Sequence, residues 1–272
     1  MIFGQFLYSK GTVVFFVVWQ KIVIAEHIFR AYDIRGVYGV DLNEEAASRI
    51  GRSLATYLDG GGKDVIAARD VRLSGQALED ALIGGLLSGG CNVEEAGVVT
   101  TPILYFCTVH YRKHGGVMVT ASHNPREWNG FKILTKEGFV CEGKGMETLK
   151  KIALTGQFKD LSPGKVRKNA HVLSDYSEHV TKGIHLERRL KAVLDPGNGS
   201  CSLLIPGLYS NVGMSVVALN SEPDGNFPAH SPDPTNEVLA QLAEVVLREK
   251  AVFGVAFDGD GDRCLFVDDR GR

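Results

Sequence analysis

The residues best suited to chemistry are the acidic stretch D-G-D-G-D-R at positions 258–263. It follows the apolar run Val252 to Phe257, which predicts a buried strand, so it stands at the strand's carboxyl end, where open α/β sheets bind ligands. Three carboxylates this close repel one another and need a cation, and hard oxygen ligands favour Mg²⁺, Ca²⁺ or Mn²⁺ over zinc. The sequence therefore predicts a divalent metal site on Asp258, Asp260 and Asp262.

Two other interpretations of this stretch are weaker. A solvated acidic turn has the same composition, but the buried strand before it and Arg263 directly after it favour a binding site. An EF-hand loop needs glycine at its sixth position and glutamate at its twelfth. Arg263 and Asp269 occupy those positions, so the EF-hand is excluded.

A second candidate is T-A-S-H-N-P at positions 120–125, directly after the strand expected at 116–120. Ser122 and His123 place a hydroxyl beside an imidazole, the usual pairing of a nucleophile with a base. The Asn124-Pro125 dipeptide restricts the backbone and would hold Ser122 forward. By itself the stretch is more simply a polar turn, and the G-x-S-x-G elbow of acyl-transfer enzymes is missing.

A third group of residues could bind phosphate. Within F-R-A-Y-D-I-R-G at 29–36, Arg35 offers a bidentate guanidinium and Tyr32 a hydroxyl. Lys132, in the strand expected at 130–135, and the stretch R-D-V-R at 69–72 could act in the same way. Ordinary surface charge, with Tyr32 in the core, explains these residues equally well.

The elements that must position these residues alternate between short β-branched runs and amphipathic segments, which is typical of an α/β layered fold. Helices are expected after the capping residues Asn43, Ser74 and Asn236 and from Pro102. Strands are expected at 64–68, 93–99, 116–120, 130–135, 190–194, 215–219, 252–257 and 264–267.

A polar stretch at 157–169, with a Pro-Gly pair and no apolar periodicity, predicts a linker between two domains. We therefore expect an atypical N-terminal extension at 1–26, a first domain at 27–160 and a second at 161–272. The proline-rich segment 222–234 of the second domain is more simply a rigid connector.

The N-terminal extension contains two apolar runs, Val13–Trp19 and Ile22–Ala25, interrupted by Gln20 and Lys21. A membrane-spanning helix needs about 20 apolar residues, and neither run approaches that length. A secretory signal is disfavoured, since only one positive charge precedes the runs and no small-residue cleavage site follows them. A β-hairpin and upstream sequence translated from a misplaced start both stay open.

The composition excludes several classes of protein. Of 272 residues, 44% are hydrophobic and 23% charged, the balance of a globular chain that buries a core, which excludes disorder and collagen. With 30 Lys and Arg against 32 Asp and Glu, there is no basic excess for nucleic acid binding, and no membrane partner is expected. The five scattered cysteines include no C-x-x-C pair, which favours the reducing cytoplasm.

Taken together and in this order, the motifs resemble the α-D-phosphohexomutase family, the phosphomannomutase and phosphoglucomutase enzymes. The likeness runs from about Phe29 to Arg272. It is carried by F-R-A-Y-D-I-R-G, R-D-V-R-L-S-G, T-A-S-H-N-P, N-G-F-K, E-P-D-G-N-F-P and D-G-D-G-D-R. The resemblance implies two successive mixed-sheet α/β domains of the phosphohexomutase type, the first with a phosphoserine loop and the second with a metal loop, and with the family's later domains absent.

The resemblance also implies residue roles. The Mg²⁺ ligands would be Ser122, as phosphoserine, and Asp258, Asp260 and Asp262. The catalytic residues would be Ser122, His123, Lys132 and Arg35, with His123 and Lys132 moving protons. The substrate-binding residues would be Tyr32, Arg35 and Arg263.

The implied activity is that of an isomerase, an intramolecular phosphotransferase that interconverts hexose 1-phosphate and hexose 6-phosphate. It would use a phosphoserine and a bound hexose 1,6-bisphosphate, which would also serve as activator. Because the chain stops after the carboxylate cluster, impaired turnover is expected without the domains that select the sugar and grip its distal phosphate. Glucose, mannose and an amino sugar stay open as the hexose, and the oligomeric state stays unknown. The alternatives are a non-catalytic metal-binding fragment and slow hydrolysis of the phosphoserine.

Overall fold

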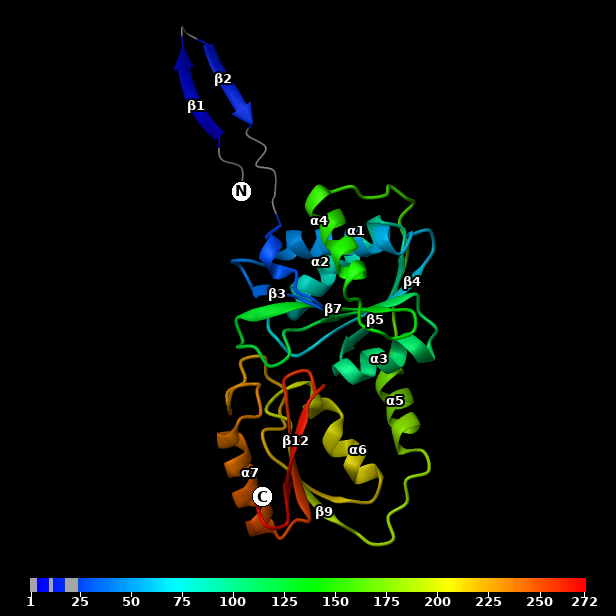
Figure 1. The fold of residues 1–272 in the computed structure, drawn as a ribbon, viewed down its shortest axis with the longest axis vertical. Coiled ribbons are helices and arrows are strands. Elements are labelled where there is room, and N and C mark those ends of the chain that lie inside the picture. Colours follow the sequence, from blue (N-terminus) through cyan, green and yellow to red (C-terminus); the bar gives the residue numbers. More distant parts are fainter. Residues whose placement is uncertain (1–3, 10–11, 18–23) are drawn as a thin grey trace.

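The computed structural model describes residues 4–9, 12–17 and 24–272. Figure 1 shows two α/β domains stacked along the long axis, with an N-terminal hairpin beyond the first. The hairpin pairs β1 (Gly4–Ser9) with β2 (Thr12–Val17) in antiparallel fashion, which is one of the two interpretations left open for the extension. Residues 18–23, which include the end of the first apolar run and the start of the second, lie outside the described residues.

The first domain is built on a mixed six-stranded sheet with the order β3-β7-β6-β4-β5-β8. Its strands are β3 (Ile34–Val37), β4 (Asp64–Arg69), β5 (Asn92–Val98), β6 (Gly115–Val119), β7 (Trp128–Thr135) and β8 (Val166–Lys168). The neighbouring strands β6, β4, β5 and β8 run parallel to one another, whereas β7 is antiparallel to both of its neighbours, β3 and β6. The parallel arrangement brings the carboxyl ends of β4 and β6 to one edge of the sheet.

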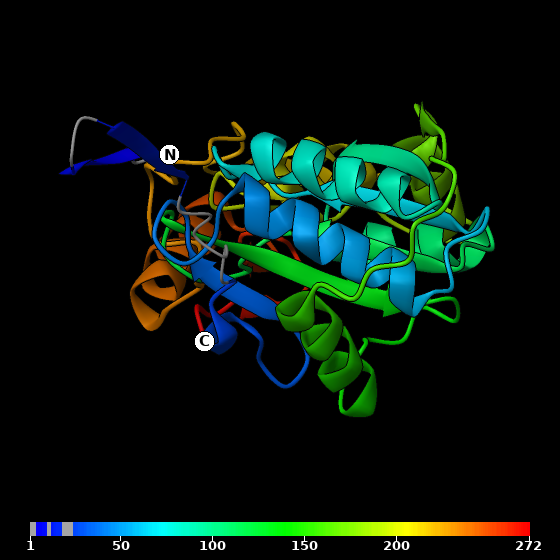
Figure 2. The same ribbon diagram turned by 90° about the horizontal axis from the view of Figure 1, so that it is seen from above.

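Helices cover both faces of this sheet. On one face lie α1 (Glu44–Tyr57), α2 (Gly75–Ser88) and α4 (Lys144–Thr155), and Figure 2 shows α1 and α2 side by side. On the other lie α3 (Thr101–His110) and α5 (Val172–Thr181). Asn43 caps α1 as predicted, because its Oδ1 accepts a hydrogen bond of 2.9 Å from the amide of Ala46.

The second domain is built on a four-stranded sheet with the order β10-β9-β11-β12. Its strands are β9 (Lys191–Asp195), β10 (Ser215–Ala218), β11 (Phe253–Phe257) and β12 (Cys264–Asp268), with only β12 antiparallel. The helix α7 (Asn236–Glu249) packs on one face, and α6 (Ile205–Asn211) on the other. The mixed α/β class expected from the sequence is confirmed.

The stretch 157–169, expected as a linker, contains β8, which pairs with β5 at the edge of the first sheet. The three residues of β8 are exposed and follow no apolar periodicity, so the hydropathy pattern does not predict a strand there. Polar contacts fix this strand instead, since Arg167 Nη2 and Asn169 Nδ2 each donate a hydrogen bond of 2.6 Å to the Glu94 carboxylate. The chain thus leaves the first sheet after Lys168, beyond the boundary expected at 160/161.

Two helix caps also differ from the expected ones. The N-cap of α7 is Thr235 rather than Asn236, which lies inside the helix. Ser74 is the N-cap residue of α2, as expected, but its side chain makes no capping bond. Its hydroxyl accepts a hydrogen bond of 2.8 Å from Asn129 Nδ2. Among the described residues, no helix combines the length and apolar character needed to cross a membrane. All five cysteines are free thiols, and Cys264 alone is exposed.

Candidate active site

The carboxyl ends of β6 and β11 meet where the two domains face each other. Ser122 follows β6, and Asp258 follows β11 directly. Ser122 Oγ donates a hydrogen bond of 2.9 Å to Asp258 Oδ2, and both side chains are buried. The two constellations singled out in the sequence thus form one site, although they belong to different domains.

The backbone at Ser122 adopts an unusual conformation. Its φ of 53° is left-handed, a region that residues other than glycine seldom occupy. The amide of Ser122 donates to Thr120 Oγ1 at 2.9 Å, and its Oγ lies 3.3 Å from His123 Nδ1. Burial and the nearby Arg263 guanidinium lower the pKa of His123, so at neutral pH the imidazole is uncharged and able to accept a proton.

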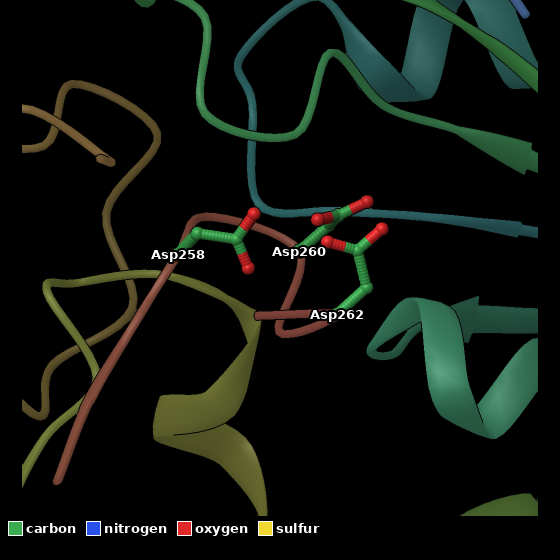
Figure 3. A group of neighbouring side chains, drawn as sticks. All are labelled: Asp258, Asp260 and Asp262. Carbon is green, nitrogen blue, oxygen red and sulfur yellow. The ribbon is translucent and has the colours of Figure 1, made fainter. Parts of the chain in front are cut away.

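The acidic side chains converge from a single turn of the chain, as Figure 3 shows. Each of Asp258, Asp260 and Asp262 offers an oxygen atom, and these atoms lie within 4.8 Å of one another. Gly261 makes the turn possible, because its φ of 71° is left-handed and a Cβ there would lie 2.5 Å from Cys201 Sγ.

The electrostatics of the triad fit a divalent cation. Burial and repulsion from the other two carboxylates raise the pKa of Asp258 to about 7. Burial opposes ionisation of Asp260 as well, but the Lys132 ammonium outweighs it and lowers the pKa of Asp260. Asp260 Oδ1 is buried without a hydrogen-bond partner. A hard cation would satisfy this orphaned oxygen and offset the repulsion, so the residues present fit Mg²⁺.

Lys132 binds the triad in this structure. Its Nζ lies 2.6 Å from Asp260 Oδ2 and also pairs with Asp262. Although burial opposes it, these two carboxylates raise the pKa of Lys132, which therefore stays protonated. In this arrangement Lys132 can donate a proton but cannot accept one.

A cavity of about 650 Å³ opens beside Ser122. It is lined by Tyr32, Arg35, Pro102, Tyr105, Ser122, His123, Lys132, Val140, Asp262 and Arg263. Asp258 and Asp260 are fully buried beneath it. Of the residues given a role by the resemblance, all but Asp258 and Asp260 line this cavity, whereas the stretch 69–72 does not.

The three expected substrate-binding residues differ in their surroundings. Tyr32 is 56% exposed at the cavity, so its interpretation as a core residue is wrong. Arg35 is buried and donates to Asp33 Oδ2 at 2.7 Å and to Asn124 Oδ1 at 2.7 Å. Arg263 Nε donates to Asp258 Oδ2 at 3.2 Å, and so contacts the same oxygen as Ser122.

Comparison with known families agrees with this geometry. Residues 26–160 match the model of phosphoglucomutase/phosphomannomutase alpha/beta/alpha domain I, and residues 174–271 match that of domain II. The chain belongs to the phosphoglucomutase/phosphomannomutase family. Its two matched domains are those that supply Ser122 and the acidic triad.

Relatives in this family match the chain along most of its length. A phosphoglucomutase/phosphomannomutase of Thermococcus kodakarensis is 37% identical over 255 residues, covering 90% of this chain and 56% of the relative. A phosphomannomutase/phosphoglucomutase of Pseudomonas putida is 41% identical over 250 residues, covering 91% and 53%. A crystal structure of a family protein from Burkholderia thailandensis superposes with a TM-score of 0.86 at 36% identity, covering 92% and 56%. The chain thus spans about half the length of these relatives.

The sequence analysis did not name every residue that contributes to this site. Thr101 Oγ1 donates to Asp260 Oδ2 at 2.6 Å, and Tyr105 lines the cavity one helical turn later. Both follow the carboxyl end of β5, so strand-end position was a usable signal for Thr101. Arg72 was named from the sequence only as a possible phosphate ligand, but it donates instead to backbone carbonyls of the Ser122 loop, which no residue-type pattern reveals.

Proposed function

We propose that this chain supplies the nucleophile and the metal centre of a phosphohexomutase that interconverts hexose 1-phosphate and hexose 6-phosphate, with mannose or glucose as the sugar. The hydrogen bond between Ser122 Oγ and the triad carboxylate of Asp258 carries the proposal. The names of the relatives from T. kodakarensis and P. putida support the substrate class.

The proposed reaction is a phosphoryl transfer in two directions. The P–O bond of phosphorylated Ser122 breaks as the free hydroxyl of a bound hexose monophosphate forms a new P–O bond. That hydroxyl's proton passes to neutral His123, which hands it on to the leaving Ser122 Oγ. The product is a hexose 1,6-bisphosphate. After this intermediate turns around, Ser122 Oγ takes the other phosphoryl group, and the leaving sugar oxygen recovers the proton.

Asp258, Asp260 and Asp262 would hold Mg²⁺ together with an oxygen of the phosphorylated Ser122. When bound, the ion would neutralise charge that develops on the transferring phosphoryl group. The other side chains orient the substrate. Arg35, Tyr32 and Arg263 line the cavity as donors for sugar phosphate, and protonated Lys132 donates toward the reacting oxygens.

The test is phosphorylation of Ser122, measured by intact-mass spectrometry after incubation with Mg²⁺ and glucose 1,6-bisphosphate. We expect one added phosphoryl group, lost in Ser122→Ala. Ser202→Ala is the matched control, because that serine lies in the second domain outside the cavity lining. Absence of the added group in the unaltered chain contradicts the proposal.

A coupled assay with glucose 1-phosphate and mannose 1-phosphate then separates the alternatives. A non-catalytic metal-binding fragment is the second candidate, because the acidic triad alone could hold a cation. Isomer formation supports the mutase. Phosphorylated Ser122 without turnover favours the fragment, and inorganic phosphate release without isomer indicates hydrolysis in the open cavity.

A further inference from the structure

The guanidinium of Arg72 is fully buried, and each of its N–H groups has an acceptor. Arginine carries five such donors. Nε donates to Asp70 Oδ2 at 3.1 Å, Nη1 to the carbonyls of Pro125 and Trp128 at 2.7 and 3.0 Å, and Nη2 to those of Ser122 and Asn124 at 2.8 and 2.6 Å. No donor is left for a phosphate, so Arg72 is not a catalytic residue.

Asp70 extends this network to the other side of Ser122. Its Oδ2 accepts a hydrogen bond of 2.6 Å from Thr120 Oγ1, which in turn accepts the amide of Ser122 at 2.9 Å. The amide and the carbonyl of Ser122 are therefore both tied, directly or through Thr120, to the pair of Arg72 and Asp70. A left-handed backbone is strained for a residue other than glycine and persists only where its surroundings fix it.

We propose that Arg72 and Asp70 form a positioning pair that holds Ser122 in its left-handed conformation and so directs Oγ toward Asp258. The pair acts through the backbone of the Ser122 loop, not on the transferred phosphoryl group. This role in phosphoryl transfer rests on the proposed function.

The second domain closes over this pair. Gly225 packs so tightly on it that a Cβ there would lie 2.3 Å from the carbonyl oxygen of Val71 and 2.9 Å from Arg72 Cα. The ring of Phe227 lies 5.3 Å from Arg72 Cζ. The segment 222–234, interpreted from sequence as a rigid connector, thus shields the guanidinium from water, which strengthens its hydrogen bonds.

The first test replaces Arg72 with lysine, which keeps the charge but has three donors in place of the planar fork. We expect the rate of Ser122 phosphorylation by glucose 1,6-bisphosphate to fall about 100-fold, the usual effect of misplacing a reacting group by about 1 Å. Mg²⁺ affinity, measured by calorimetry, should change little, because the triad lies on another loop. Arg167→Lys, at the far edge of the sheet, is the matched control and should change neither quantity.

The second test measures amide hydrogen exchange in the unphosphorylated protein, so it does not depend on activity. Arg72→Lys should raise exchange at 120–128 while the second domain keeps its protection. Thr120→Val removes both hydrogen bonds of the Thr120 hydroxyl, to Asp70 and from the Ser122 amide, but leaves those of Arg72 intact. It should raise exchange more weakly, and Thr120→Ser should restore protection. If Arg72→Lys unfolds the chain, amide exchange at 120–128 in the two Thr120 variants tests the positioning role instead.

Unchanged exchange at 120–128, with or without slower phosphorylation, overturns the positioning role. An unaltered chain that is never phosphorylated contradicts the proposed function alone, because the exchange comparison still tests the Arg72 network.

Discussion

Thr101 and Asp260 are joined twice across the two domains. The amide of Thr101 donates to the Asp260 carbonyl at 2.8 Å, and its hydroxyl donates to Asp260 Oδ2 at 2.6 Å. Thr101 begins α3 of the first domain, whereas Asp260 lies in the acidic loop of the second. The acidic loop is thus anchored to the domain that carries Ser122 by contacts that need no metal.

Replacing Thr101 with valine should weaken this anchor. The buried carboxylate of Asp260 loses a hydroxyl donor, so we expect the free energy of unfolding to fall by about 2 kcal/mol. Urea denaturation measures the change. Thr155→Val is the control, since the Thr155 hydroxyl bonds to a carbonyl in an exposed position and its loss should cost little. Equal losses for the two variants would contradict the anchor.

Asp258→Asn should stabilise the metal-free protein in alkaline solution. The folded pKa of Asp258, about 7, exceeds its ordinary 3.8, so the folded state favours the protonated carboxyl, and stability is lost as pH rises through this range. Asparagine avoids that loss. Melting curves at about pH 8 should therefore show a higher Tm for the variant without Mg²⁺.

Adding Mg²⁺ should reverse this order. The ion raises the Tm of the unaltered chain by binding only the folded state, and the variant, which lacks one ligand, should respond weakly. Asp269→Asn, outside the triad, should keep the full response. A strong Mg²⁺ response in Asp258→Asn would remove Asp258 from the ligand set.

The buried pair of His230 and Asp195 should make stability depend on pH. The Nε2–Oδ2 distance is 3.3 Å, and the Asp195 carboxylate raises the pKa of His230. Burial raises the pKa of Asp195, but His230 and other donors outweigh it and lower that pKa. The His230 contribution is complete below the ordinary pKa of 6.5 and lost as pH rises through the raised value. The Asp195 contribution is present above 3.8 and lost as pH falls through the lowered value.

The pair thus stabilises most between these two ordinary values. His230→Gln should cost about 1–3 kcal/mol at about pH 5.5 and much less at about pH 8.5, as measured by urea unfolding. His185→Gln, at an exposed position, is the control. A loss independent of pH would show that packing, not charge, is what His230 contributes.

Gly225→Ala should push the two domains apart. Its new Cβ meets the backbone of the first domain, which cannot yield as a flexible side chain would. We expect a loss of about 1–3 kcal/mol in unfolding free energy, together with slower Ser122 phosphorylation. Gly84→Ala is the matched control, because nothing lies within 4 Å of that Cβ and alanine favours the helix by about 0.5–1 kcal/mol. If both variants gain stability, the close approach at Gly225 is refuted.

The sequence predicted the features that depend on apolar burial and on residue type, but not those that depend on polar contacts formed by folding. Burial patterns predicted the buried strands near Ser122 and Asp258, because apolar periodicity records which face is buried. The three exposed residues of β8 were not predicted as a strand, because edge pairing and ion pairs produce no apolar periodicity. Residue type marked the acidic triad, whereas Arg72 was indistinguishable from surface charge, because its partners are backbone carbonyls brought near only by folding.

The partition of Ser122 and the acidic triad between two domains ties the site to the docking of those domains. The contact of 2.9 Å between Ser122 Oγ and Asp258 Oδ2 exists only while the two domains are docked. A variant that loosens the docking would separate the hydroxyl from the carboxylates while both sheets stay folded.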